Sequence, residues 1–233
     1  MAYSTINKHT DHFNTVLYTG NGSTNAITGV GFQPDFVWCK DRDAGNNHIF
    51  HDAVRGVNYQ IYSDIHNAQT NASGFLTAFG TDGFTLGSDG AINQNSSNYA
   101  SWNWKGAGST ASNSNGSITS TVSANTTAGF SIVKYTGTGS NATVGHGLSA
   151  APRMILFKNL SSARNWIVYH KGRGATKNLY LDMNNSVNTA SDTFNNTAPT
   201  STVFSIGSSV GTNESGDDII AYCFHSVEGY SKI

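Results

Sequence analysis

Short stretches that alternate apolar and polar residues fill this chain, and turns rich in glycine and asparagine separate them. Such a pattern is typical of β-strands joined by tight turns, and it leaves almost no room for helix. In the first half the predicted strands lie at residues 15–19, 35–40, 48–54, 58–63, 75–79, 84–87 and 99–105. Their regular spacing favours β-sandwiches and jelly rolls.

The second half of the chain repeats the first. Phe13 in FNTVLYTGNGS corresponds to Phe130 in FSIVKYTGTGS, at an offset of 117 (130 − 13), and Lys105 corresponds to His225, at an offset of 120 (225 − 105). Self-similarity of this kind fixes the architecture before any local assignment. We therefore predict an all-β protein of two tandem jelly-roll-like β-sandwich units, related by internal duplication.

The predicted units are residues 1–105 and 118–233. Residues 106–117, GAGSTASNSNGS, contain no apolar residue larger than alanine, and they are predicted to be a polar linker. We expect limited proteolysis to cut there first.

Two strands carry most of the large apolar residues. Residues 35–40 are apolar on both faces, which indicates a central strand in a sheet that is covered on both sides. Trp102 and Trp104 share one face of the strand 99–105, and the repeat places Tyr222 and Phe224 at the same positions. We therefore expect that face to be the core, with Trp38 also inside the first unit.

Composition excludes several classes of partner. Charged residues make up 12% of the 233 residues, the formal net charge is −1, and basic residues do not cluster, so we expect neither nucleic acid nor membrane insertion. No segment resembles a secretory signal or a membrane span. Cys39 and Cys223 occupy non-equivalent positions in the two repeats, which favours free, buried thiols over a disulfide.

No motif of an enzyme is present, and we predict no enzymatic activity. Asp64 and Asp182 recur at matched positions, and paired carboxylates are typical of a glycosidase, but each of the two follows a strand, where an aspartate commonly caps a turn. His48 and His51 are the nearest approach to a metal cluster. The repeat replaces both histidines with aromatic residues, which favours packing over ligation.

Candidate ligand-binding residues lie in two polar loops at corresponding places in the repeats. They are Asn93, Asn95 and Tyr99 in the first unit, and Asn213, Glu214 and Asp217 in the second. Glu214, Asp217 and Asp218 together offer oxygen ligands for calcium, although a solvated acidic loop is the favoured interpretation. We expect no other cofactor.

Several phrases of the sequence resemble a known family. YTGNGS, GVGFQPDFVW, DGFTLGS, SWNWK, AGFSIVKYTG and IAYCFHSVEGYSK are similar to repeated β domains of virion structural and adsorption proteins of marine bacteriophages, cyanobacterial phages among them. The resemblance covers nearly the whole chain, although Asn103 stands where the family usually has cysteine. It implies a structural or adsorption protein of a phage particle, without an established active site.

Two functions remain open on this basis. One is a tail-fibre adhesin that recognises a host-surface glycan or protein through its loops. The other is a capsid decoration or head-attached structural protein that binds other virion chains. A polysaccharide depolymerase is a third, weaker alternative. In each case we expect a homo-oligomer, located on the virion after assembly in the host cytoplasm.

Overall fold

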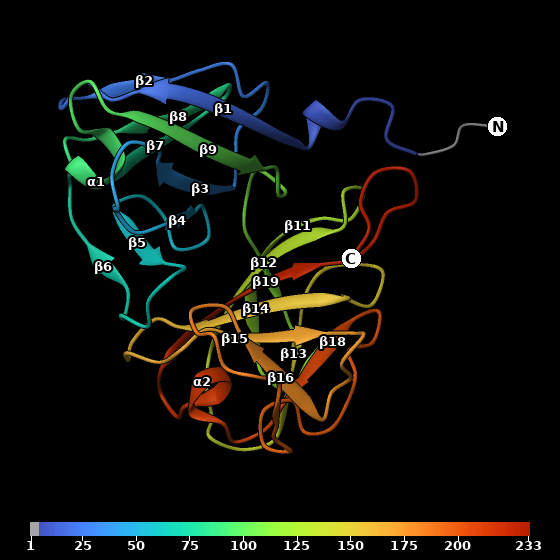
Figure 1. Ribbon diagram of the computed structural model, residues 1–233. Coiled ribbons are helices and arrows are strands. Elements are labelled where there is room, and N and C mark those ends of the chain that lie inside the picture. Colours follow the sequence, from blue (N-terminus) through green and yellow to red (C-terminus); the bar gives the residue numbers. More distant parts are fainter. Residues whose placement is uncertain (1–4) are drawn as a thin grey trace. The chain divides into compact units, whose positions relative to one another are not determined.

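The computed structural model describes residues 5–233, and their regular secondary structure is almost entirely antiparallel β-sheet (Figure 1). The all-β prediction is confirmed. The first half contains η1 (His9–Asp11), β1 (Phe13–Thr19), β2 (Asn25–Ile27), β3 (Phe36–Asp41), β4 (Ile49–Asp52), β5 (Tyr59–Tyr62), β6 (Thr70–Asn71), β7 (Leu76–Gly80), β8 (Gly83–Leu86), α1 (Gly90–Asn93) and β9 (Asn98–Trp104). The second half contains β10 (Ala111–Asn113), β11 (Ser120–Asn125), β12 (Phe130–Thr136), β13 (Ala142–Gly145), β14 (Met154–Asn159), β15 (Ile167–His170), β16 (Lys177–Tyr180), β17 (Asn188–Thr189), β18 (Val203–Ile206), α2 (Val210–Asn213) and β19 (Asp218–Phe224).

The chain divides into two compact units. The first unit comprises Lys8–Asp64 and Gln69–Ser109, and the second comprises Thr110–Ile233 with the short segment Ile65–Ala68. Residues 106–117, expected to be a polar linker, are fixed at both ends. The buried carboxylate of Asp35 accepts hydrogen bonds from the amides of Gly106 and Gly108, and β10 pairs with β11 in the second unit.

Both units arrange their strands in the same order. The large sheet of the first unit runs β1-β9-β3-β4-β5-β6, and that of the second contains β12-β19-β14-β15-β16-β17, extended beyond β12 by β11 and β10. β1 pairs with β9 in the first unit, and β12 pairs with β19 in the second. Each unit also has a smaller sheet formed by strands from between these two in the sequence, with β2 beside β8 and β13 beside β18. This correspondence agrees with the duplication, which itself remains a prediction.

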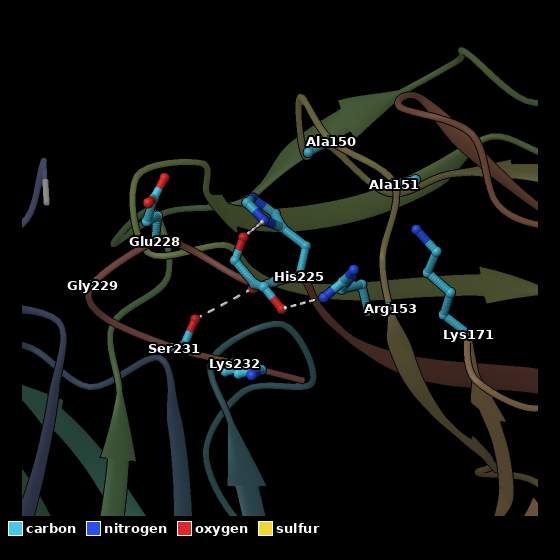
Figure 2. Close-up of a pocket in the computed structure, with 10 residues that line it drawn as sticks. Ala150, Ala151, Arg153, Lys171, His225, Glu228, Gly229, Ser231 and Lys232 are labelled. Carbon is cyan, nitrogen blue, oxygen red and sulfur yellow. Dashed lines mark hydrogen bonds between the residues drawn. The ribbon is translucent and has the colours of Figure 1, made fainter.

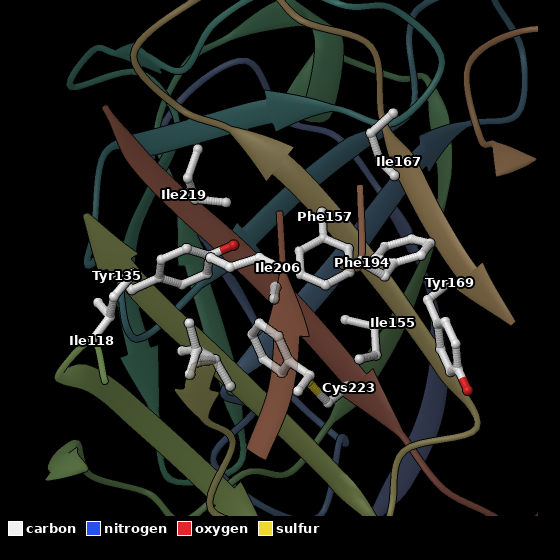
Figure 3. Close-up of a cluster of buried hydrophobic side chains, with 14 of the residues drawn as sticks. Ile118, Tyr135, Ile155, Phe157, Ile167, Tyr169, Phe194, Ile206, Ile219 and Cys223 are labelled. Atoms are coloured by element: carbon white, nitrogen blue, oxygen red, sulfur yellow. The ribbon is translucent and has the colours of Figure 1, made fainter. Parts of the chain in front are cut away.

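Each unit has its own hydrophobic core on one face of its large sheet. In the first unit Val37 and Cys39 of β3 contribute to it. In the second, Phe157 of β14 packs against Phe194, with ring centroids 5.8 Å apart (Figure 3). Phe157 also packs against Phe204, with ring centroids 5.2 Å apart. Strand β3 is buried on both faces, as the sequence predicted, since Phe36 on its other face is also buried.

The prediction that the tryptophans line the core is wrong. Trp38 and Trp102 contact each other on the opposite face of the large sheet, with ring centroids 5.4 Å apart, and remain partly exposed. The core side of β9 carries the buried Ser101 and Asn103 instead. Alternation along a strand shows which residues share a face, but it cannot say which of two apolar faces the sandwich encloses.

Both cysteines are free and buried, as predicted. Within residues 5–233, no helix has the length and apolar character needed to cross a membrane.

Candidate functional site

Two of the three candidate asparagines, Asn93 and Asn213, are structural residues. Asn93 ends α1 and is fully buried. Its amide nitrogen donates to the carbonyl oxygens of Ser23 and Gly87, and its Oδ1 accepts from the backbone amide of Asn21 at 3.0 Å. Because a buried amide must have its hydrogen bonds satisfied, Asn93 holds the turn after β1 against the helix.

Asn213 does the same in the second unit. It ends α2, is fully buried, and donates to the carbonyl oxygens of Ser140 and Gly207 at 2.7 and 2.6 Å. Its Oδ1 accepts from the amide of Thr138 at 2.7 Å. The expectation that Asn93 and Asn213 contact a ligand is therefore corrected. An asparagine in a polar loop was taken for a surface residue, whereas its recurrence at an offset of 120 (213 − 93) indicated a shared loop structure.

Tyr99 is also an internal residue, which corrects its assignment as a ligand contact. Its side chain is buried and stacks on Tyr18 with ring centroids 5.1 Å apart. The hydroxyl donates to the carbonyl of Gly90 and accepts from the amide of Gln94, both at 2.9 Å. Asn95 is the one first-unit candidate that is exposed in the described structure.

The acidic residues of the second loop have protein partners of their own. Glu214 forms an ion pair with Arg164 at 2.8 Å. Asp217 accepts from Ser162 Oγ at 2.7 Å and from Asn159 Nδ2 at 2.9 Å, and these hydrogen bonds lower the pKa of its carboxyl.

Asp218 forms an ion pair with a different residue. Its carboxylate pairs with Lys134 at 2.7 Å, so the three candidate calcium ligands do not converge on one point. Within residues 5–233, no group of three or more histidine, cysteine, aspartate or glutamate side chains is placed to hold a metal ion. The arrangement fits an acidic loop that is held by side-chain hydrogen bonds better than it fits a calcium site.

The other residues considered for catalysis or metal binding form hydrogen bonds within the protein. Asp64 and Asp182 accept hydrogen bonds from the backbone amides of His48 and Trp166, each at 3.1 Å. Both donors lie 16 residues earlier in the chain, so each carboxylate holds a distant segment of its own unit and does not cap the turn that follows its strand. His51 is buried beside the carbonyl of Tyr59, and burial lowers its pKa to about 4.

Lys158 is the most buried cationic side chain of the second unit. Burial lowers its pKa to about 8, which is a property that reactive lysines share. Its Nζ, however, donates to the carbonyl oxygens of Asn159 and Arg164 at 2.9 and 2.7 Å. These bonds tie the turn after β14 to the strand, and they leave the amine enclosed by carbonyl oxygens.

A pocket of the second unit brings several charged side chains together (Figure 2). Its volume is about 610 Å³. The wall comes from the loop before β14, the turn after β15 and the segment after β19. It is lined by Ala150, Ala151, Arg153, Lys171, His225, Ser226, Glu228, Gly229, Ser231 and Lys232.

The segment after β19 is held in place by Arg153 and Ser226. Nη1 of Arg153 donates to Ser226 Oγ and to the carbonyl oxygen of Ile233, each at 3.1 Å. Ser226 Oγ also accepts from the amide of Ile233 at 3.0 Å, and Val227 bridges to Ser231. The segment is thereby folded back to form one wall of the pocket.

Basic side chains outnumber acidic ones in the lining of the pocket. Arg153, Lys171 and Lys232 stand against the single carboxylate of Glu228, and both lysines are exposed. Among the described residues, neither lysine side chain forms an ion pair. The site is therefore able to receive an anionic group, with Arg153 partly pre-positioned by its contacts to Ser226.

Sequence reasoning missed this pocket. Its basic residues are single residues separated by about 20 to 60 positions, and they meet only because β14, β15 and β19 are neighbours in the sheet. The phrase HSVEGYSK, which supplies most of one wall, was recognised only as part of a family resemblance.

The fold and the pocket together describe an all-β protein with a solvent-open pocket lined by three basic residues other than histidine. Residues 8–233 match the family described as "Domain of unknown function (DUF7483)", so the chain belongs to that family. No curated protein and no solved structure matches the chain.

Proposed function

We propose that this chain is a surface protein of a bacteriophage particle that acts by binding, and that its basic pocket takes an acidic group of a host-surface glycan. The sequence phrases support the first part, because they resemble virion structural and adsorption proteins. The second part depends on one observation, the gathering of Arg153, Lys171 and Lys232 around a single pocket. A tail-fibre role is the form of the proposal that uses this site.

The pocket suits a ligand of this kind in size and chemistry. Its volume of about 610 Å³ lies within the range of small-molecule sites. A carboxylate, sulfate or phosphate on a sugar gains charge-assisted hydrogen bonds from arginine and lysine. Ser231 and the backbone around Gly229 add neutral hydrogen-bonding groups for hydroxyls.

The test is a binding titration of the full chain with an oligosaccharide of uronic acid residues and with its neutral counterpart. We expect saturable binding of the acidic sugar only, weakened by salt because exposed charges are screened. Lys171→Gln and Lys232→Gln should each weaken binding about tenfold. Lys177→Gln is the matched control, since Lys177 is exposed in the same unit but does not line the pocket.

Equal binding of both sugars, or equal loss in Lys171→Gln and Lys177→Gln, would contradict the pocket assignment. The absence of catalysis is tested in the same experiment by assaying for new reducing ends. Cleavage that disappears in Asp64→Asn or Asp182→Asn would favour a depolymerase instead.

A capsid decoration or head-attached role is the second candidate. The observation that favours it is that β1, the terminal strand of the large sheet in the first unit, pairs with β9 alone and leaves its other edge open to a strand of another polypeptide. Saturable binding to phage heads that lack the protein, without binding to host cells, would select this role over the adhesin.

A further inference from the structure

The outer edges of the two large sheets differ. In the second unit β12 lies between β19 and β11, so both of its edges are paired. In the first unit β1 pairs with β9 alone and is the terminal strand of the described sheet. The same place in the strand order is thus covered in one unit and open in the other.

The ladder shows which backbone groups are left open. The amide of Gly20 donates to Ser97, and the amide of Lys105 donates to His12, so the even-numbered residues between them bond to β9. Hydrogen bonding alternates along an antiparallel pair, and the N–H and C=O groups of Thr15 and Leu17 therefore point away from the sheet.

The backbone hydrogen bonds alternate in the same way along β12 of the second unit. There the amide of Gly137 donates to Asp217, so the odd-numbered residues of β12 bond to β19. Ile132 and Lys134 consequently direct their backbone groups to β11, where they lie opposite Ser123 and Thr121. The groups that β11 satisfies on β12 are the ones that β1 leaves open.

Nothing in the sequence of β1 protects this edge. FNTVLYT has no charge, proline or glycine, and its register with β9 is continuous from Phe13 to Thr19. The side chain of Leu17 is 63% exposed. Natural edge strands are commonly shortened, charged or bulged to prevent pairing. The corresponding edge strand of the second unit, β10, has only three residues.

Two side chains cover part of the open ladder. Asn14 Oδ1 accepts from the amide of Thr15, and Asn25 Nδ2 donates to the carbonyl of Thr19. Both asparagines are half-buried and form further hydrogen bonds, Asn14 with the carbonyl oxygen of Val30 and Asn25 with Asn93 Oδ1, and they leave the central residue Leu17 uncovered. An incoming strand can replace the two contacts to β1 with backbone hydrogen bonds.

We propose that β1 is a docking edge that receives an extended segment of another polypeptide by antiparallel strand addition. The occupant has the chemistry of β11, an uncharged run of about six residues in which serine or threonine alternates with small aliphatic residues. The second unit supplies the argument for this choice, because it places Ser120–Asn125 on the equivalent edge. The proposal is independent of the glycan site.

The experiment uses the full chain and a fluorescent peptide with the sequence of residues 117–126, SITSTVSANT. We expect saturable binding by fluorescence anisotropy, and slower amide hydrogen exchange at Leu17 in the complex. Peptide N-methylation at the positions of Thr121 and Ser123 removes the donors that face β1 and should weaken binding about tenfold or more. N-methylation at the positions of Val122 and Ala124 is the matched control and should leave binding unchanged.

Because both blocking changes are in the peptide, the test does not depend on a variant that fails to fold. Absence of saturable binding, or equal effects of the two methylated peptides, would overturn the docking edge. Concentration-dependent dimerisation that protects Leu17 from exchange without any peptide would show that a second copy occupies the edge, and would overturn the assignment of the partner. Loss of glycan binding in the pocket variants would leave each of these results unaffected.

Discussion

The two units solve one problem of loop geometry in the same way. Tyr18 donates from its hydroxyl to the carbonyl of Ile92, and Tyr135 donates to that of Thr212, so each tyrosine holds its short helix to the sheet. A Cβ at Gly20 would lie 2.1 Å from the carbonyl oxygen of Gln94, and glycine is needed for this approach. The second unit has the same close approach at Gly137, at 2.2 Å.

The interiors of the two units differ much more than their loops. The turn after β4 contains the buried ion pair of Asp52 and Arg55, whereas Arg173 at the corresponding turn after β15 is exposed. Strand β9 directs Asn103 to the core side of the sheet, where β19 has Cys223. The same strand order is thus compatible with polar or apolar buried residues, provided that the hydrogen bonds of the loops that connect the strands are kept.

The sharpest difference between the units is expected at the buried ion pair. Arg55→Met leaves the carboxylate of Asp52 buried without its cation, and should lower the free energy of unfolding by about 3–5 kcal/mol. Arg173→Met removes an exposed guanidinium and should change it by less than about 0.5 kcal/mol. Urea unfolding of both variants measures the difference. Similar losses in the two variants would mean that the two turns are equivalent after all.

The loop asparagines should show the opposite behaviour, a similar loss in both units. Asn93→Ala and Asn213→Ala each leave several buried backbone groups without a hydrogen-bond partner. Each should lower the free energy of unfolding by about 2–3 kcal/mol. Hydrogen exchange resolves the units from one another, and each variant should accelerate exchange in its own unit. Asn95→Ala is the control, since Asn95 is exposed beside Asn93. A large effect in one unit alone would break the equivalence of the loops.

Each unit also contains one buried histidine whose pKa burial lowers to about 4, His51 in the first and His146 in the second. His146 accepts from the amide of Leu148 and contacts the carbonyl of Thr200, which suits the neutral ring. The unfolded chain binds a proton near pH 6.5, so it holds more protons than the folded chain between pH 6.5 and 4. Stability should therefore fall as the pH falls through this window, by up to about 1.4 kcal/mol per pH unit for each histidine.

Thermal or urea unfolding between pH 7 and pH 4.5 checks this slope. His51→Gln and His146→Gln cannot titrate, and each should remove about half of it. A slope that neither variant changes would assign the acid sensitivity to other groups.

The smallest effect is expected from copying the second interior into the first. Ser101→Ala with Asn103→Cys installs the residues of Ala221 and Cys223, and removes a buried Asn103 Oδ1 that has no hydrogen-bond partner in the described structure. Removing both polar partners together is often nearly neutral. We expect a change within about 1 kcal/mol in urea unfolding, while Asn103→Cys alone should cost more because Ser101 Oγ loses the hydrogen bond that it accepts from Asn103.

Much of this fold was predictable from the sequence, and the reasons are local. Strand β3 is apolar on both faces, so its burial could be predicted from its own residues alone. The core side of β9 could not, because Trp102 and Ser101 each occupy a face that the fold buries or half-buries. That choice depends on which neighbouring elements cover the sheet, and these are distant in sequence.

The candidate site was predictable to a lesser extent. Asn93 and Tyr99 have the composition of a binding loop, and only their burial shows that they bind the protein's own backbone. Conversely, Arg153, Lys171 and Lys232 carry no motif, since each comes from a different connection of the sheet. Residue types alone do not distinguish a loop that binds a ligand from a loop that binds itself.

The pairing of the first strand with the last in each unit has a consequence for biosynthesis. β1 cannot pair until β9 has been made, and β12 must wait for β19. Contacts this distant in sequence slow folding, because the intervening chain must close as one large loop before they contribute. On the ribosome β9, the last strand of the first unit, is made before β10, the first strand of the second. The nested order therefore favours folding one unit at a time, which limits mispairing between two segments as alike as β1 and β12.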